Sequence, residues 1–169
     1  MNTTVGEIRN RIRGIAVDTN VAKITVRGVV DRPGIAAGLF EPLSDADISV
    51  DVIVQNASVE GTTDMTFTVK RTDLIRALEV TRQVARRLGN GEVVSADHLA
   101  KLSIVGTGMQ DAPGYASTMF RTLADNKINI DMITTSEIRI TCIVDESDVA
   151  LAARALHTSF QLDNPSQVP

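Results

Sequence analysis

The chain has 169 residues, of which 43% are hydrophobic and 22% charged, and its formal net charge is −4 at pH 7. This composition is typical of a globular protein with enough residues for one domain or two small ones. The acidic balance argues against nucleic-acid binding, which favours a basic face. No apolar run approaches the roughly 20 residues of a membrane helix, and the N-terminus lacks the features of a secretion signal, so we expect a cytoplasmic protein.

Hydrophobic periodicity predicts alternating strands and helices in the first half of the chain. Apolar residues at every second position indicate strands, and those at three- and four-residue steps indicate buried helix faces. Thr72 or Asp73 is a candidate cap for the second helix, which Gly89 would end. An extended segment is expected over 8–17, ending near 18–20, followed by strands at 23–27, 48–54, 65–69 and 92–95 and helices over 35–46 and 74–88.

The second half of the chain repeats the first. The offset is 80 residues, the separation of Pro33 from Pro113, and it holds without gaps for some twenty residues. It matches Ala36 to Ala116, Phe40 to Phe120, Leu43 to Leu123, Asp45 to Asp125, Ile48 to Ile128, Asp51 to Asp131 and Ile53 to Ile133. Such matching predicts a duplicated β-α-β-β-α-β module of roughly 70–80 residues.

The two modules differ at their ends. Module one is expected over 20–97 and module two over 98–162, but residues 163–169 form a polar tail with two prolines, which is a poor strand. The N-terminal segment within 8–17 is a spare strand of suitable length for the second sheet. We therefore predict an α+β chain of two ferredoxin-like βαββαβ modules with antiparallel sheets and helices on one face, module one being inserted in module two.

No pattern of catalytic chemistry stands out. Gly106–Met109 lacks the Gly-Lys-Ser/Thr that completes a phosphate-binding loop, and no Gly-x-Ser-x-Gly elbow is present. Cys142 is the single cysteine, so it offers neither an internal disulfide nor a metal pair. Asp51 and Asp131 occupy equivalent places in the repeat, which duplication explains better than acid–base catalysis. We expect no catalytic site, no metal and no cofactor in this chain.

The turn Asp31–Ala36 has the chemistry of an amino-acid site. Pro33 suits a first helical turn, and Gly34 allows another group to approach the backbone closely. The following helix N-terminus favours a carboxylate, and Asp31 can meet an ammonium group. The residues alone leave two interpretations open: a binding turn for a free α-amino acid, or a plain helix start.

Four segments carry a resemblance to a known family: Gln55–Ser58, Gly61–Phe67, Asn129–Ile133 and Thr135–Ile140. The module resembles the ACT domain, a regulatory module that binds amino acids. The pair, over about residues 20–162, resembles the C-terminal regulatory region of aspartate kinase (aspartokinase) or its separate regulatory beta subunit. The starting Met1 and the missing kinase domain fit a free subunit or an excised region.

The resemblance implies feedback control of the first step from aspartate toward lysine, threonine and methionine. It implies a homodimer whose effectors bind between module one of one chain and module two of its partner, beside a catalytic subunit that binds ATP and aspartate. The implied threonine site consists of Asp31, Arg32, Pro33, Gly34, Ile35, Ala36 and Gln55, completed by Asn129 and Ile130 of the other chain. The implied second site, used for lysine in some members, consists of Ser49, Val50, Asp51, Tyr115, Ala116, Ser136 and Glu137.

Three questions stay open from the sequence. Ala116 stands where members that respond to lysine and threonine often have a threonine, so lysine binding is undecided. Thr66 and Ser58 stand where feedback-resistant changes arise in the family, although Thr66 equally suits a packing role. The alternatives are a free-standing tandem-ACT regulator of another pathway, such as a glycine-cleavage regulator, and a small autonomous enzyme.

Overall fold

The computed structural model describes residues 12–56, 60–89, 91–109 and 114–163. Its contacts divide the chain into two compact units. The inserted unit is Asn20–His98, and the outer unit is formed by the residues up to Thr19 together with those from Leu99 onward. In the described part of the chain, no helix is long and apolar enough to cross a membrane.

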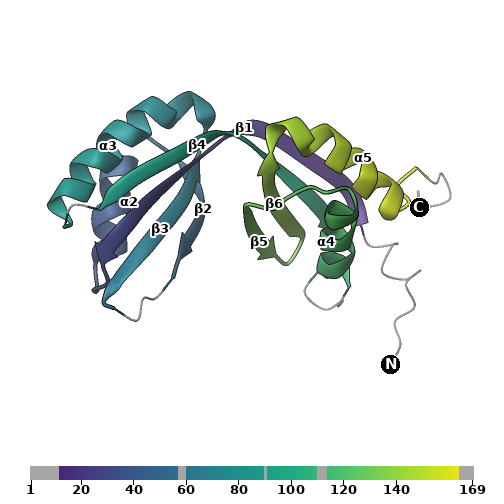
Figure 1. Cartoon of the computed structure of the whole chain (residues 1–169), viewed down its shortest axis with the longest axis horizontal. Coiled ribbons are helices and arrows are strands. Elements are labelled where there is room, and N and C mark those ends of the chain that lie inside the picture. The colour runs from purple at the N-terminus through teal and green to yellow at the C-terminus, as the bar shows by residue number, and fades with distance from the viewer. Residues whose placement is uncertain (1–11, 57–59, 90, 110–113, 164–169) are drawn as a thin grey trace. The chain divides into compact units, whose positions relative to one another are not determined.

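The inserted unit is a four-stranded antiparallel sheet with both helices packed on one face (Figure 1). Its strand order is β2-β3-β1-β4, as expected for a βαββαβ module. The elements are the second part of β1 (Ile12–Val30), α2 (Ile35–Asp45), β2 (Val50–Gln55), β3 (Thr62–Val69), the 3-10 turn Arg71–Asp73, α3 (Leu74–Arg87) and the first part of β4 (Glu92–Gly106). Phe67, Leu39 and Ala77 lie in its buried core.

The outer unit repeats this arrangement with the strand order β1-β4-β6-β5. It adds α4 (Tyr115–Asp125), β5 (Met132–Ser136), β6 (Arg139–Asp145), the 3-10 turn Glu146–Asp148 and α5 (Val149–Ser159). Ile12, at the start of β1, is 3% exposed and belongs to this core. The N-terminal part of β1 thus supplies the fourth strand of the outer sheet. The predicted fold class, with module one inserted in module two, is confirmed.

Three local predictions were wrong. The extended segment does not end near 18–20 but continues as one strand through Val30, and the strand expected at 92–95 runs on to Gly106. Residues 16–20 are all exposed, so their side chains show no alternation although the backbone is extended. Asp73 occupies the N-cap position of α3 without a side-chain cap bond. Because Asp73 is itself the last residue of the 3-10 turn Arg71–Asp73, its backbone already has right-handed helical angles, and its carboxylate pairs with Arg76 at 3.7 Å instead.

The duplication extends to a pair of hydroxyl contacts that the sequence comparison did not anticipate. Thr25 and Thr66 face each other across β1 and β3, with their Oγ1 atoms 2.9 Å apart. Ser103 and Thr141 face each other across β4 and β6, with their hydroxyl oxygens 2.7 Å apart. Met65 and Phe67, on either side of Thr66, enter the core under the helices, so these hydroxyls lie on the opposite face of the sheet. Thr66 therefore has a structural contact of its own.

Replacing Thr81 by valine is expected to raise the free energy of unfolding by about 1 kcal/mol. Thr81 is 0% exposed in α3, and its Oγ1 has no hydrogen-bond partner among the described residues. Valine keeps the β-branched shape while removing the buried hydroxyl. The change is read from urea unfolding followed by circular dichroism.

The matched control is Thr68→Val in β3. Thr68 is also 0% exposed, but its Oγ1 accepts a hydrogen bond from the Val52 N–H at 3.1 Å. The loss of that acceptor leaves a buried N–H unsatisfied, so this variant should lose about 1–3 kcal/mol. Equal losses in both variants would contradict the assignment of Thr81 as an unsatisfied group.

Candidate functional site

The turn between β1 and α2 has a left-handed glycine immediately before the helix. Gly34 has φ +88°, and nothing lies within 4 Å of the place where its Cβ would be, so the backbone angle rather than space calls for glycine. The Ile35 N–H donates to the Arg32 carbonyl at 3.2 Å, and the Gly38 N–H to the Gly34 carbonyl at 2.9 Å. The N–H groups of Ala36 and Ala37, which lie between these two donors, are among those that a helix start leaves without an intrahelical acceptor.

The side chains of the turn divide into an exposed group and an anchor. Asp31, Arg32 and Pro33 are exposed, whereas Ile35 is 4% exposed in the core of the inserted unit and Ala36 is half-buried. The anchored helix start thus presents a carboxylate and a guanidinium to solvent, next to the backbone N–H groups that the first turn leaves without an intrahelical acceptor. A zwitterionic ligand of amino-acid size has complementary groups: a carboxylate for the helix N-terminus and an ammonium for Asp31.

The turn and Gln55 lie at the same end of the inserted sheet. The Asp31 N–H donates to the Gly61 carbonyl at 2.9 Å, which fixes the turn to the start of β3. The Thr63 hydroxyl donates to the Asn56 carbonyl, which fixes the end of β2 to the same part of β3. Gln55, exposed at the end of β2, pairs with Met65. The structure therefore brings this predicted site residue to within one strand of the turn.

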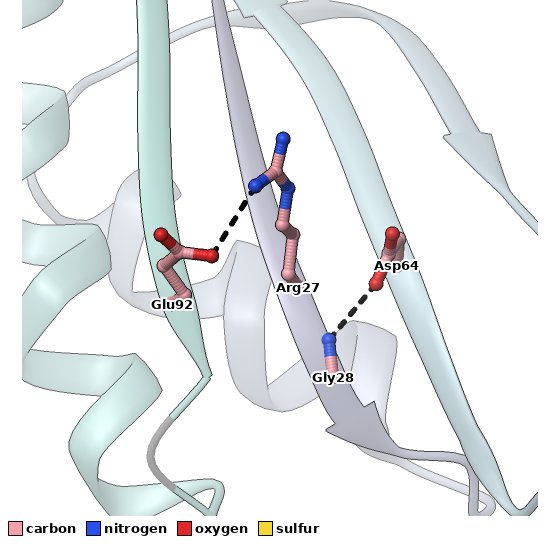
Figure 2. Close-up of polar contacts among 4 residues, drawn as sticks. All are labelled: Arg27, Gly28, Asp64 and Glu92. Atoms are coloured by element: carbon pink, nitrogen blue, oxygen red, sulfur yellow. Dashed lines mark hydrogen bonds and ion pairs between the residues drawn. The ribbon is translucent and has the colours of Figure 1, made fainter.

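A β-bulge precedes the turn in β1. The pairing of β1 with β3 shifts between Val26 and Val29, so two residues of β1 stand opposite Asp64. Gly28, in the bulge, has φ +68°, and its N–H donates to Asp64 Oδ1 at 2.9 Å (Figure 2). The bulge is thus closed by a side chain of the neighbouring strand.

Beside the bulge, Arg27 and Glu92 connect β1 to β4. Arg27 Nη1 lies 3.3 Å from Glu92 Oε2 (Figure 2), and the two side chains are 55% and 66% exposed, so the pair contributes little to stability. Position 91, next to Glu92, requires glycine, because a Cβ there would lie 2.9 Å from the Arg27 carbonyl oxygen. Close backbone approach at this position excludes larger residues.

Asn129 and Ile130, predicted to complete the first site, belong to the outer unit. They lie in the segment between α4 and β5, where Asn129 is exposed and Ile130 packs partly against the outer core. Ser49 lies between α2 and β2 of the inserted unit, and Val50 and Asp51 begin β2; Ser49 and Asp51 are exposed, whereas Val50 is half-buried. The two sets are thus in matching places within their own units.

The residues of the predicted second site are placed differently. Ser136 and Glu137 are exposed at the β5–β6 turn, and the Glu137 carbonyl accepts from the Met109 N–H at 3.1 Å. Tyr115, by contrast, is 0% exposed in the outer core, so its ring is not accessible to a ligand. Ala116 is half-buried. Residues 111–113 of this turn lie outside the described residues, as do Ala57 and Ser58.

The ACT-domain model matches residues 24–84 and 102–160 of this chain, which together make up most of its length. A solved structure similar to the chain is that of aspartokinase alpha and beta subunits, with a TM-score of 0.83 and 44% identity over 89% of this chain and 99% of that one. The chain belongs to the ACT family and to its aspartokinase regulatory branch.

Two further relatives agree with this assignment. The ligand-free regulatory subunit of aspartate kinase from Thermus thermophilus is 37% identical, with a TM-score of 0.84 over 89% of this chain and 99% of that one. The aspartokinase of Pseudomonas aeruginosa is 48% identical over 156 residues, which are 92% of this chain and 38% of that protein. This ACT chain therefore spans less than two fifths of the length of the curated aspartokinases that it matches.

Sequence reasoning missed the contact between Gly28 and Asp64 in this ACT chain. A glycine inside an otherwise alternating strand indicates a bulge, and Gly28 follows the alternating run 23–27 directly. The signal was thus available. The identity of the residue that closes the bulge depends on the register between β1 and β3, which hydrophobic periodicity does not give.

The buried thiol of this ACT chain should be chemically inert. Cys142 is 0% exposed, with Sγ 4.0 Å from Met119 Sδ, and burial raises its pKa from 9.0 to about 12. At pH 8 we expect Ellman's reagent to detect no reactive thiol in the folded chain and one thiol per chain in denaturant. Rapid reaction of the folded chain would contradict this placement.

The same pKa shift has a defined sign for stability. Because the folded pKa lies above the unfolded value, the contribution of Cys142 is fully present below pH 9 and is lost as the pH rises from 9 toward 12. A Cys142→Ala variant should therefore lose stability less steeply than the original chain over this range. Urea unfolding at successive pH values measures the difference between the two slopes.

Proposed function

We propose that this chain is the amino-acid-sensing regulatory part of an aspartokinase and that threonine is its effector. The observation that carries the proposal is the anchored turn Asp31–Ala36, which places the exposed Asp31 carboxylate in the turn that leads into the N-terminus of α2. Asp31 would bind the ammonium group, and the N–H groups of Ala36 and Ala37 would bind the carboxylate. Gln55, at the same end of the sheet, would hydrogen-bond the side-chain hydroxyl.

The complete site is proposed to form in a homodimer, with Asn129 and Ile130 contributed by the second copy. The internal repeat supports this arrangement, because Ser49 and Val50 are the equivalents of Asn129 and Ile130 at the 80-residue offset. Each chain would then contribute to two related sites. In the second site, Asp51 and Glu137 would offer carboxylates to a lysine ammonium, with Tyr115, Ala116 and Ser136 beside them.

Control of the kinase would follow from linkage between effector binding and the state of the assembly. Threonine can inhibit only to the extent that it binds the inhibited arrangement more tightly than the active one. The catalytic subunit would bind ATP and aspartate, and this chain would supply feedback inhibition of lysine and threonine biosynthesis in the cytoplasm. No step of phosphoryl transfer is assigned to this chain.

The test is reconstitution with an aspartokinase catalytic region, such as that of the Pseudomonas aeruginosa relative. The chain and the tagged catalytic region are co-expressed, and aspartate-dependent ATP turnover is measured with and without threonine. We expect co-purification and inhibition by threonine. Turnover by the isolated chain would refute the regulatory role. A complex whose rate threonine leaves unchanged would refute threonine as the effector.

A further inference from the structure

Asp64 holds the bulge that leads into the Asp31–Ala36 turn. We propose that Asp64 is a positioning residue for this turn, acting through the Gly28 N–H rather than by touching the ligand. The identification of the turn as the ligand site rests on the function proposed above. Asp64 belongs to the Gly61–Phe67 segment, to which none of the predicted site residues belongs.

The geometry of the bulge gives Asp64 this role. The backbone nitrogen of Gly28 lies 2.9 Å from Asp64 Oδ1 (Figure 2), and Gly28 has φ +68°. A bulge bends its strand and changes the direction of the residues that follow. Asp31 comes three residues after Gly28. The direction in which the chain leaves β1 and enters the Asp31–Ala36 turn therefore depends on the bulge that Asp64 closes.

The segment from Gly28 to Asp31 is held to β3 at both ends. At its far end the Asp31 N–H donates to the Gly61 carbonyl at 2.9 Å, and between them Val29 pairs with Thr63. Those contacts join backbone atoms, so they depend little on which residues occupy these positions. The contact at Gly28 needs an acceptor in the side chain at position 64. Asp64 is thus the sequence-dependent part of the attachment.

The corresponding strand end of the outer unit is attached through backbone atoms. The pairing of β4 with β6 keeps one register from Leu99 to Val105. Beyond it the Gly106 N–H donates to the Ile138 carbonyl and the Met109 N–H to the Glu137 carbonyl, with Gly108 at φ +64° between them. Two residues before Thr66 stands Asp64, whereas two residues before the equivalent Thr141 stands Arg139, which offers donors only. An Asp64 substitution should therefore affect the first ligand turn and leave the second unchanged.

The test compares Asp64→Ala, Asp64→Asn and the control Thr25→Val in the full 169-residue chain. Thr25→Val removes another polar contact between β1 and β3, the 2.9 Å contact to Thr66, away from the turn. Amide exchange by NMR reports on Asp31, and calorimetry reports on threonine affinity. In Asp64→Ala we expect Asp31 exchange to rise and threonine affinity to fall, each about tenfold. Asp64→Asn keeps a side-chain acceptor, so its Asp31 exchange rate and threonine affinity should both stay close to those of the original chain. Thr25→Val should change neither the exchange rate nor the affinity.

Two results would overturn the inference. One is unchanged Asp31 exchange in Asp64→Ala, and the other is an equal change in Thr25→Val, which would make Asp64 an ordinary strand contact. If the original chain binds no threonine, the proposed function fails, but Asp31 exchange still decides whether Asp64 positions the turn. The two failures are thus distinguishable.

Discussion

Replacing Asp31 by alanine is expected to weaken threonine binding about 10- to 100-fold without changing the fold. Asp31 is exposed and is the acidic group directly before the α2 N-terminus, so its carboxylate is the proposed partner of the ligand's ammonium. A hydrogen bond to a charged group contributes about 1.5–3 kcal/mol, which corresponds to this loss in affinity. Isothermal titration calorimetry with threonine measures the change.

The matched control is Asp45→Ala, at the opposite end of the same helix. Asp45 is the last residue of α2 and is also exposed, so the substitution removes the same charge far from the proposed site. It should leave the threonine affinity within about twofold of the original value, since surface substitutions away from a site have small effects. Equal losses in both variants would indicate a general charge effect and contradict the role of Asp31.

Replacing Phe67 by alanine is expected to lower the free energy of unfolding of the inserted unit by about 3–5 kcal/mol. Phe67 is 0% exposed, and its ring meets that of Phe40 edge-on, with centroids 5.3 Å apart and an interplanar angle of 79°. The expected loss of stability combines the transfer free energy of the removed side-chain atoms, the cost of the cavity left behind and the lost ring contact between β3 and α2. Urea unfolding followed by circular dichroism gives the value.

Ile75→Ala is the control for apolar loss at the surface. Ile75 lies in the first turn of α3 and is 82% exposed, so its truncation should change the unfolding free energy by no more than about 0.5 kcal/mol. A Phe67→Ala variant that loses less than about 1 kcal/mol would contradict the placement of Phe67 at the centre of this core.

The sequence predicted the features that depend on periodicity and duplication. The 80-residue offset identified the two modules, and the poor strand potential of residues 163–169 led to the prediction that the N-terminal strand completes the outer sheet. Ile12, buried with the outer core, agrees with that prediction. The Pro33-Gly34 turn was recognisable because proline and glycine have backbone preferences that act locally.

The features that depend on pairing between strands were not predictable in the same way. The continuity of β1 across 16–20 leaves no trace in the side chains, because that stretch is exposed on both faces. The Gly28–Asp64 contact requires the register of β1 against β3. Tyr115 is buried in the outer core, whereas only the family resemblance had named it as a site residue.

The central claim is that this ACT chain binds threonine at the Asp31–Ala36 turn, and calorimetric titration of the unmodified chain with threonine tests it most directly. The account predicts a saturable heat that Asp31→Ala weakens and Asp45→Ala does not. The absence of any heat with threonine, under conditions where the chain is folded, would contradict it.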